Sequence, residues 1–386
     1  MVARRLRVLL VGPIASIHVR HWHDYLTRRG HSVHVFSGEP LPDGVAGGDG
    51  DRLRFPGLPK SVRYSLGALQ LRAVIRRTAP DVVHVQSLGA NALLAPAIPR
   101  RLLVVTLWGS DVVDAMKNPV RRLVMRDALR RAALVLTTSR AMSGVAIDEI
   151  GAAPDRVRTV SWGVDTELFV PGAADERSRI RQSFGLPTGG TLFTAIRTSE
   201  RTYRTLEVIR AFAAALGSSA DRHLAIVAGF ESNDPRAREE QRRYREAIRR
   251  EASAVRGSAI SFIRGHLSQV EYAALLRASD VAISVPESDQ RSSSVLEALA
   301  SGTTVVLSDL APYRELVADG YHAHVIEDPM EIGLTRWLRD PEFLSRREVA
   351  ENVSLIARTE SRREQFREIE EALVSVASRH RGGRTG

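Results

Sequence analysis

Short apolar runs alternate along this chain with stretches of helical periodicity, and this alternation limits the architectures that the chain can adopt. The first apolar runs are expected to form strands over residues 6–11, 32–37, 82–86, 102–107, 134–138 and 158–161. Helical patterns separate them, most clearly over residues 19–29, 64–77 and 121–131. Strands that are apolar on both faces and joined through helices are typical of a parallel sheet covered by helices on both sides.

A second series of the same kind follows. Strands are expected over residues 191–196, 223–228, 260–264, 281–285 and 304–308, and helices over residues 206–215, 236–256, 270–278 and 293–300. A chain of 386 residues is long enough for two domains of ordinary size. The sequence therefore predicts an α/β protein with two Rossmann-like, doubly wound parallel-sheet domains. We expect them over residues 1–171 and 172–378, with a last helix that packs back on the N-terminal domain and a disordered tail over residues 379–386.

Composition excludes several classes of protein. The chain has no cysteine, so disulfides and thiolate metal sites are ruled out. No apolar run reaches the ~18 residues of a membrane span. The start loosely imitates a signal peptide, but its apolar run is short and meets Gly12-Pro13, which favours a buried first strand. We therefore expect a cytoplasmic protein.

The net charge of +10 is unevenly distributed. Residues 1–170 hold 24 Lys and Arg against 14 Asp and Glu, so the remainder of the chain is neutral. A basic first half favours an anionic partner, such as a phosphate-bearing substrate or a membrane surface. Residues 117–131 combine six cations with apolar side chains, and they are either a peripheral contact with an anionic membrane or a solvated helix face. The aromatic content of 5% argues against nucleic-acid binding by stacking.

The segment of residues 285–302 carries the clearest signal of chemistry. A strand ends there, a loop follows, and a helix begins near Ser293. Serines at a helix start leave free N–H groups at a positive dipole end, and these bind phosphate. Glu297, one turn inside the helix, is placed to meet a ribose hydroxyl, and Asp289 in the loop can accept bonds from a sugar. An ordinary capping cluster with an acid in the first turn is the alternative.

This segment resembles the Glu-x7-Glu motif of the retaining, nucleotide-sugar-dependent glycosyltransferases of family 4, with Asp289 and Glu297 as its two acids. Further matches lie at His18-Val-Arg-His-Trp22, Thr106-Leu-Trp-Gly-Ser-Asp111, Trp162-Gly-Val-Asp-Thr-Glu-Leu-Phe169 and Arg197. The resemblance implies a GT-B fold, in which two domains face a cleft. It also implies transfer of a sugar from a nucleoside diphosphate, UDP above all, to a hydroxyl with retention, in glycoconjugate or natural-product biosynthesis.

Site residues follow from matching positions. The resemblance assigns catalytic roles to Arg197, Asp289 and Asp111. It places the donor beside Arg197, Tyr203, Gly265, His266, Asp289, Arg291, Ser293, Ser294, Val295 and Glu297. It places the acceptor beside Gly12, Ser16, His18, Trp108 and Ser110. For Asp111 a capping role stays open, for Trp108 a core position, and for His18 an ordinary polar loop position.

Two departures from the family pattern affect the expected donor site. Tyr203 stands where the family has a phosphate-binding lysine, so Arg201, Arg204 or Arg291 would have to compensate. Trp108 stands where many members have a histidine that approaches the donor sugar. Asp49-Gly-Asp51 imitates a metal motif, but we interpret it as solvated loop and expect no metal or other cofactor.

Two other functions stay open. A GT-B nucleotide-sugar epimerase would turn over the donor without an acceptor. A non-catalytic protein that binds membranes or nucleic acid would show no preference for a nucleoside diphosphate, and the two acids Asp289 and Glu297 argue against it. For the transferase we expect a small-molecule or lipid-linked acceptor, with phosphate-bearing acceptors favoured by the basic first half, and a cytoplasmic location that includes the inner membrane face.

Overall fold

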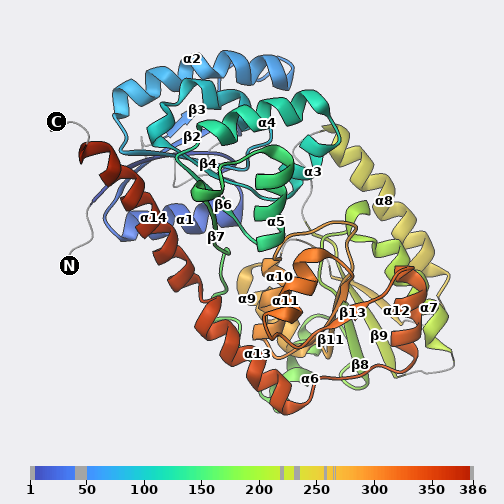
Figure 1. Ribbon diagram of the computed structural model, residues 1–386. Coiled ribbons are helices and arrows are strands. Elements are labelled where there is room, and N and C mark those ends of the chain that lie inside the picture. Colours follow the sequence, from blue (N-terminus) through green and yellow to red (C-terminus); the bar gives the residue numbers. More distant parts are fainter. Residues whose placement is uncertain are drawn as a thin grey trace. The chain divides into compact units, whose positions relative to one another are not determined.

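The computed structural model describes residues 5–39, 50–217, 221–229, 235–255, 259–263, 265 and 267–382. Its contacts divide the chain into two compact units, Met1–Trp162 with Arg363–Gly386, and Gly163–Arg362. Each unit is a parallel sheet with helices on both faces, which confirms the predicted fold class (Figure 1). The chain passes from the first unit to the second after Trp162, earlier than the expected boundary at residue 171. The last helix returns to the first unit.

The first unit holds a seven-stranded sheet in the order β3-β2-β1-β4-β5-β6-β7. Its strands are β1 (Arg7–Val11), β2 (Ser32–Ser37), β3 (Gly50–Arg52), β4 (Val82–Gln86), β5 (Leu103–Thr106), β6 (Leu134–Thr137) and β7 (Val157–Thr159). The edge strand β3 was not expected. It contains Asp51, whose carboxylate lies 2.8 Å from the His34 imidazole and also pairs with Arg77. The interpretation of Asp51 as solvated loop is therefore wrong, and Asp49 lies outside the described residues.

Side chains of β1 alternate between two cores, as a strand covered on both faces requires. Leu9 and Val11 join the core under α2 to α5, whereas Val8 and Leu10 join the core under α1 and α14. The helices of this unit are α1 (Ile17–Arg28), α2 (Lys60–Thr78), η1 (Ala90–Ala97), η2 (Arg100–Leu102), α3 (Ser110–Met116), α4 (Pro119–Arg131), α5 (Arg140–Gly144), η3 (Val145–Ile150), η4 (Pro154–Arg156) and α14 (Arg362–Gly382).

The C-terminal helix α14 completes the first unit. Phe366 packs edge-on against Trp22 of α1, with ring centroids 5.2 Å apart. The nearby Glu370 carboxylate accepts a hydrogen bond from the Tyr25 hydroxyl at 2.7 Å and contacts the buried His31 imidazole at 2.9 Å. Because α14 continues to Gly382, residues 379–382 are helical rather than part of the expected disordered tail. Residues 383–386 lie outside the described residues.

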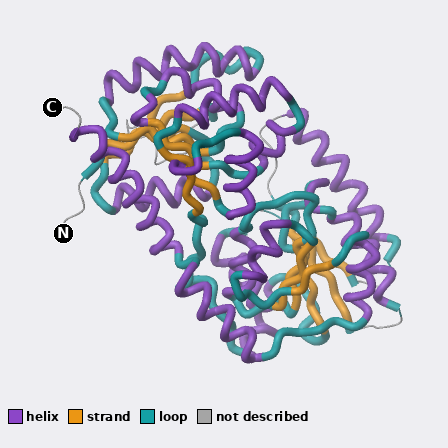
Figure 2. Tube along the Cα trace, viewed as in Figure 1, coloured by secondary structure: helices purple, strands orange, loops and turns teal. Residues whose placement is uncertain are grey.

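The second unit holds a six-stranded sheet in the order β10-β9-β8-β11-β12-β13, again flanked by helices (Figure 2). Its strands are β8 (Thr191–Ala195), β9 (Arg222–Val227), β10 (Ile260–Ile263), β11 (Val281–Ser284), β12 (Thr304–Ser308) and β13 (His324–Ile326). Its helices are α6 (Ala174–Ser183), η5 (Arg201–Tyr203), α7 (Thr205–Leu216), α8 (Pro235–Ser253), α9 (Gln269–Ala278), α10 (Ser293–Ala300), α11 (Ala311–Ala318), α12 (Met330–Arg339) and α13 (Arg346–Thr359).

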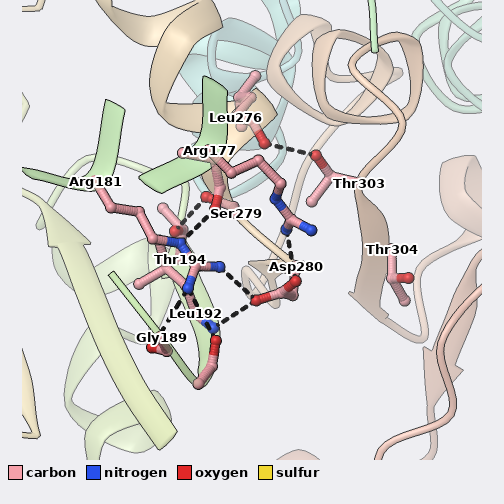
Figure 3. A network of polar contacts seen from close by, with 12 residues as sticks. Arg177, Arg181, Gly189, Leu192, Thr194, Leu276, Ser279, Asp280, Thr303 and Thr304 are labelled. Atoms are coloured by element: carbon pink, nitrogen blue, oxygen red, sulfur yellow. Dashed lines mark hydrogen bonds and ion pairs between the residues drawn. The ribbon is translucent and has the colours of Figure 1, made fainter. Parts of the chain in front are cut away.

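A polar network fixes the amino ends of β8 and β11 (Figure 3). The Asp280 carboxylate accepts hydrogen bonds from Arg181 at 2.7 Å, from Arg177 at 2.5 Å and from the Leu192 N–H at 2.7 Å. Both arginines belong to α6, so the network attaches this helix to the sheet. Ligands of parallel sheets bind at the opposite, carboxyl ends of the strands. This network is therefore structural, and the site must be sought at the other end of the sheet.

Candidate active site

Helix α10 begins directly after the loop that follows β11. Ser292 precedes it in extended conformation, and its side chain makes no capping hydrogen bond. The first N–H bonded within the helix is that of Leu296, which donates to the Ser292 carbonyl at 3.1 Å. The N–H groups of Ser293, Ser294 and Val295 thus remain without a helical partner at the positive end of the helix dipole. This helix start has the chemistry of an anion site, as the sequence predicts.

Arg197 lies just beyond the carboxyl end of β8 and points its guanidinium at the serines of α10. It donates to the Ser294 hydroxyl at 2.8 Å and to the Ser292 hydroxyl, and its side chain is 15% exposed. Although burial disfavours the charged form, the carboxylate of Asp289 at 3.1 Å raises the pKa of Arg197 above its usual value. A permanent cation is therefore fixed beside three free N–H groups.

Tyr203 lies beneath this cation. The Arg197 guanidinium carbon is 4.4 Å from the centroid of the Tyr203 ring, a cation–π contact. The residue that replaces the family's lysine therefore adds no second charge to the site. Instead it supports the one cation that is there.

Asp289 is held by neighbours on several sides. Its Oδ1 accepts from the Gln290 N–H at 2.8 Å, and its Oδ2 accepts from the Tyr313 hydroxyl at 2.7 Å while pairing with Arg197. Tyr313 is 1% exposed, and burial, reinforced by Asp289, raises its pKa well above the usual range. Tyr313 was missed by the sequence analysis, because it lies in α11 without any motif around it. The chain Tyr313–Asp289–Arg197 orients the cation.

Glu297 is a largely buried acid in α10, and the residue is 6% exposed. Burial raises the pKa of Glu297 to about 8, against the opposing effect of the cations Arg362 and Arg197. Burying an ionised carboxylate is costly, and a ligand hydroxyl that donates a hydrogen bond to it would offset part of that cost.

Arg362 and Asp165 belong to the surroundings of Glu297, and the sequence analysis gave neither a role. Arg362 Nη1 lies 3.4 Å from Asp165 Oδ2. Arg362 donates its N–H to the Val164 carbonyl at 2.8 Å, and a Cβ at Gly163, whose φ is +68°, would come within 2.4 Å of the Arg362 Cα. Only glycine fits this approach. The motif of residues 162–169 contains Asp165 and could have pointed to it, but the sequence analysis gave that motif no function.

Arg291 was expected to help bind the donor phosphates, but its contacts serve another purpose. The residue is 9% exposed, and its guanidinium donates to Glu360 at 2.8 Å and to Asp319 at 2.8 Å. These carboxylates neutralise it, so Arg291 joins the ends of α11 and α13 instead of facing the helix start of α10. Gly265 has a φ of +82°, with open space where a Cβ would lie, and His266 is outside the described residues.

In the first unit, the expected acceptor residues lie around the starts of α1 and α3. Gly12 passes so close to β4 that an added Cβ would lie 2.8 Å from the Gln86 Cβ and carbonyl oxygen, which requires glycine. Ser16 precedes α1 without capping it through its side chain, and Ser110 is exposed at the start of α3. These residues therefore leave polar groups accessible at the carboxyl edge of the sheet.

Three rings meet at the same edge. His18 stacks on Trp162, with centroids 5.0 Å apart, and approaches Trp108 edge-on at 6.1 Å. Trp108 donates its indole N–H to the Gln86 side chain at 3.3 Å, and Gln86 in turn contacts the buried His84, whose pKa burial lowers to about 3. The structure thus brings His18 and Trp108 together as expected neighbours. It adds Trp162, which the sequence analysis did not assign to the site.

Asp111 was predicted as a catalytic residue or a helix cap, and its contacts are those of a structural residue. It is 5% exposed and accepts backbone hydrogen bonds from Leu88 at 2.6 Å, Trp108 at 3.1 Å and Val112 at 3.0 Å. Burial raises the pKa of Asp111, while these N–H groups oppose the rise. The carboxylate therefore fixes the loops after β4 and β5.

Within the described residues no three His, Asp or Glu side chains are grouped as a metal site would need. None of the helices in the described part of the chain is long and apolar enough to cross a bilayer.

Solved structures share this fold over nearly the whole chain. Sucrose-phosphate synthase from Thermosynechococcus elongatus aligns with a TM-score of 0.78 at 16% identity, covering 97% of this chain and 100% of that one. HepE from Anabaena, solved with UDP and glucose, aligns with a TM-score of 0.72 at 16% identity, covering 96% and 100%. The fold is therefore that of the two-domain GT-B glycosyltransferases.

Sequence comparison narrows the class to a family. Residues 15–168 match the model of Glycosyltransferase Family 4, and residues 176–355 match that of Glycosyl transferases group 1. The MMP alpha-(1->4)-mannosyltransferase of Mycolicibacterium hassiacum is 26% identical, over 86% of this chain and 87% of its own. The D-inositol 3-phosphate glycosyltransferase of Corynebacterium aurimucosum is 27% identical, over 56% and 51%. The chain belongs to the GT-B glycosyltransferases of the family 4 type, and it is a glycosyltransferase.

Proposed function

We propose that the protein transfers a glycosyl group from a nucleoside diphosphate sugar, with UDP as the favoured nucleotide, to a hydroxyl acceptor with retention and without a metal ion. The observation that carries this proposal is the single helix α10, which presents three free N–H groups beside Arg197 at its start and the buried Glu297 one turn further on. A diphosphate followed by a ribose matches that order of groups. The UDP complex of the structurally similar HepE supports the choice of nucleotide.

The chemistry follows from the charge on the leaving group. As the bond between the anomeric carbon and the diphosphate breaks, negative charge grows on the phosphate oxygens. Arg197 and the N–H groups of Ser293, Ser294 and Val295 stabilise that charge from fixed positions. The leaving phosphate takes the proton of the acceptor hydroxyl on the same face of the sugar, which gives retention without a protein nucleophile. Asp289 and Tyr313 keep the cation oriented, and Glu297 accepts a ribose hydroxyl.

We propose that the acceptor binds the first unit, beside His18, Trp108 and Ser16, and that it carries phosphate. The excess of basic residues in that half supports an anionic acceptor. The name of the Corynebacterium relative includes D-inositol 3-phosphate, a phosphorylated cyclitol, which agrees with this choice. The Michaelis constant for such an acceptor rises more steeply than that for the donor between low salt and about 0.5 M salt, because screening weakens its encounter. A salt-insensitive acceptor constant would point to a neutral acceptor.

Calorimetric titration against UDP, GDP and ADP tests the donor site directly. We expect binding of one nucleoside diphosphate. At about pH 9, above the Glu297 pKa of about 8, the carboxylate is ionised, and Glu297→Ala weakens binding by about 1.5–3 kcal/mol, the range for a hydrogen bond to a charged group. Glu246→Ala is the matched control, because Glu246 is 47% exposed on α8 and pairs with Arg242. Failure to bind any of the three nucleotides refutes the donor site.

Consumption of the donor without an acceptor would favour an epimerase. NMR spectra of the product show the configuration at its anomeric carbon and so decide whether the transfer proceeds with retention.

A further inference from the structure

Helix α2 and the loop before it expose an apolar stripe that nothing in the catalytic proposal uses. Side chains of this outer stripe are between 39% and 64% exposed; its members are Phe55, Leu58, Val62, Leu66 and Leu69. In the helix, Val62, Leu66 and Leu69 follow the i, i+4, i+7 spacing of one face. The opposite face is buried in the core through Tyr64, Gly67, Leu71 and Val74. Helix α2 is therefore apolar on both sides.

The charged residues in the segment that carries the outer stripe are all positive. Residues 52–80 contain seven Lys and Arg and no Asp or Glu. Lys60, Arg72 and Arg76 are exposed, and within the described part of the chain none of them has an ion-pair partner. Arg72 and Arg76 lie next to Leu69 on the helix surface, at i+3 and i+7. Exposed apolar side chains are thus interleaved with uncompensated cations.

We propose that the outer stripe of α2 docks on the surface of an anionic lipid bilayer. A helix that lies in the membrane interface needs apolar side chains for the acyl boundary and cations for the anionic headgroups, and this stripe offers both. A second copy of the chain fits poorly, because a two-fold interface would set these cations against one another. An acidic protein surface would match the cations but would leave Phe55, Leu66 and Leu69 against polar groups.

Helix α4, where the sequence suggested a membrane contact, is less suited to that role. Arg122 and Arg126 donate to the carbonyls of Glu149 at 2.5 Å and Ile150 at 3.0 Å, and Arg131 pairs with Asp127 at 2.6 Å. These contacts engage much of its positive charge within the fold. Leu123 of α4 is nevertheless 65% exposed, so it provides a matched control for the leucines of α2.

Flotation of the full chain with lipid vesicles tests the proposal. The vesicles contain phosphatidylcholine alone, or phosphatidylcholine with about one third phosphatidylglycerol. We expect binding only to the mixed vesicles. Leu66→Ser with Leu69→Ser weakens it at least about tenfold, since two leucines no longer bury in the interface. Leu123→Ser leaves it unchanged, and thermal unfolding verifies that every variant is folded.

Other outcomes would overturn the proposal. Absence of binding to the mixed vesicles at about 0.05 M salt refutes a membrane surface altogether. Equal binding by the wild type and the α2 double variant refutes the role of the outer stripe and leaves only diffuse attraction of the basic unit. If Leu123→Ser weakens vesicle binding as much as the α2 double variant does, the membrane contact is not specific to the outer stripe, which overturns the proposal. Binding to polyglutamate but not to the vesicles identifies an acidic protein as the partner instead.

Discussion

Replacing Glu297 by glutamine should stabilise the protein at alkaline pH, because the wild type then holds a largely buried negative charge. Burial raises the pKa of Glu297 from 4.5 to about 8. Between these values the folded protein holds a proton that the unfolded chain has released. Stability therefore falls as pH rises through this window and becomes level above about pH 8. Glutamine has no such titration.

The size of the effect follows from the shift. One pKa unit corresponds to about 1.36 kcal/mol, so a change from 4.5 to about 8 corresponds to at most about 5 kcal/mol. For a unit of roughly 200 residues, about 2–4 °C of Tm correspond to each kcal/mol, which gives up to about 10–20 °C. The unpaired amide of the variant costs stability at every pH and therefore cancels from the comparison.

The assay is calorimetric unfolding of the wild type and Glu297→Gln at pH 5 and pH 9. The difference in Tm between the two proteins should shift in favour of the variant as pH rises. Glu287→Gln, which changes an exposed carboxylate in the loop before α10, should show no such pH dependence. A difference between wild type and Glu297→Gln that stays constant from pH 5 to pH 9 would refute the reasoning, since the carboxylate would then be solvated or paired.

Further substitutions test other parts of the structure. Arg197→Ala should lower kcat by about two to three orders of magnitude, and more than it weakens donor binding, because the cation acts on charge that develops in the transition state; retention of more than about a tenth of the rate contradicts this role. Asp111→Ala should lower the free energy of unfolding by about 3 kcal/mol, as buried N–H groups lose their acceptor; an unchanged denaturation midpoint argues against the structural role. Glu370→Ala should cost a similar amount, since it leaves Tyr25 and His31 unpaired in the core; a Tyr25→Phe background should reduce that cost. Activity should persist in EDTA, and a loss that Mg²⁺ restores would overturn metal independence.

The inner strands were accessible to prediction because each is an apolar run between turn residues, whereas the edge strands β3 and β13 (His324–Ile326) were not expected. The expected strand over residues 32–37 coincides with β2 (Ser32–Ser37), and that over residues 304–308 with β12 (Thr304–Ser308). Strand β3 (Gly50–Arg52) escaped because three polar residues in a glycine-rich stretch become a strand only by pairing with β2. Local pattern carries no information on such pairing.

The candidate site, like the sheets, contains one part that the sequence could predict and another that it could not. The start of α10 was accessible because serines at a helix start have a local chemical meaning. The partners of each charge were not accessible, because the fold brings them from distant parts of the chain. Arg291 looked like a free cation until the fold placed Glu360 and Asp319 against it, and Asp289 gained Tyr313 from the next helix. Net charge in a sequence thus says little about which cations remain available.

The return of α14 to the first unit has a consequence for the order in which the protein can fold during synthesis. The core face that Phe366 and Leu373 cover is formed by strands of the first unit and by α1, yet α14 is synthesised only after the whole second unit. Roughly 200 residues, those of the second unit, are translated in between, which takes about 10–40 s at 5–20 residues per second. During that time Trp22 and its apolar neighbours lack their final packing partners, so the first unit should depend on chaperones until α14 has emerged. A truncation that removes α14 would therefore damage the half of the protein that is made first.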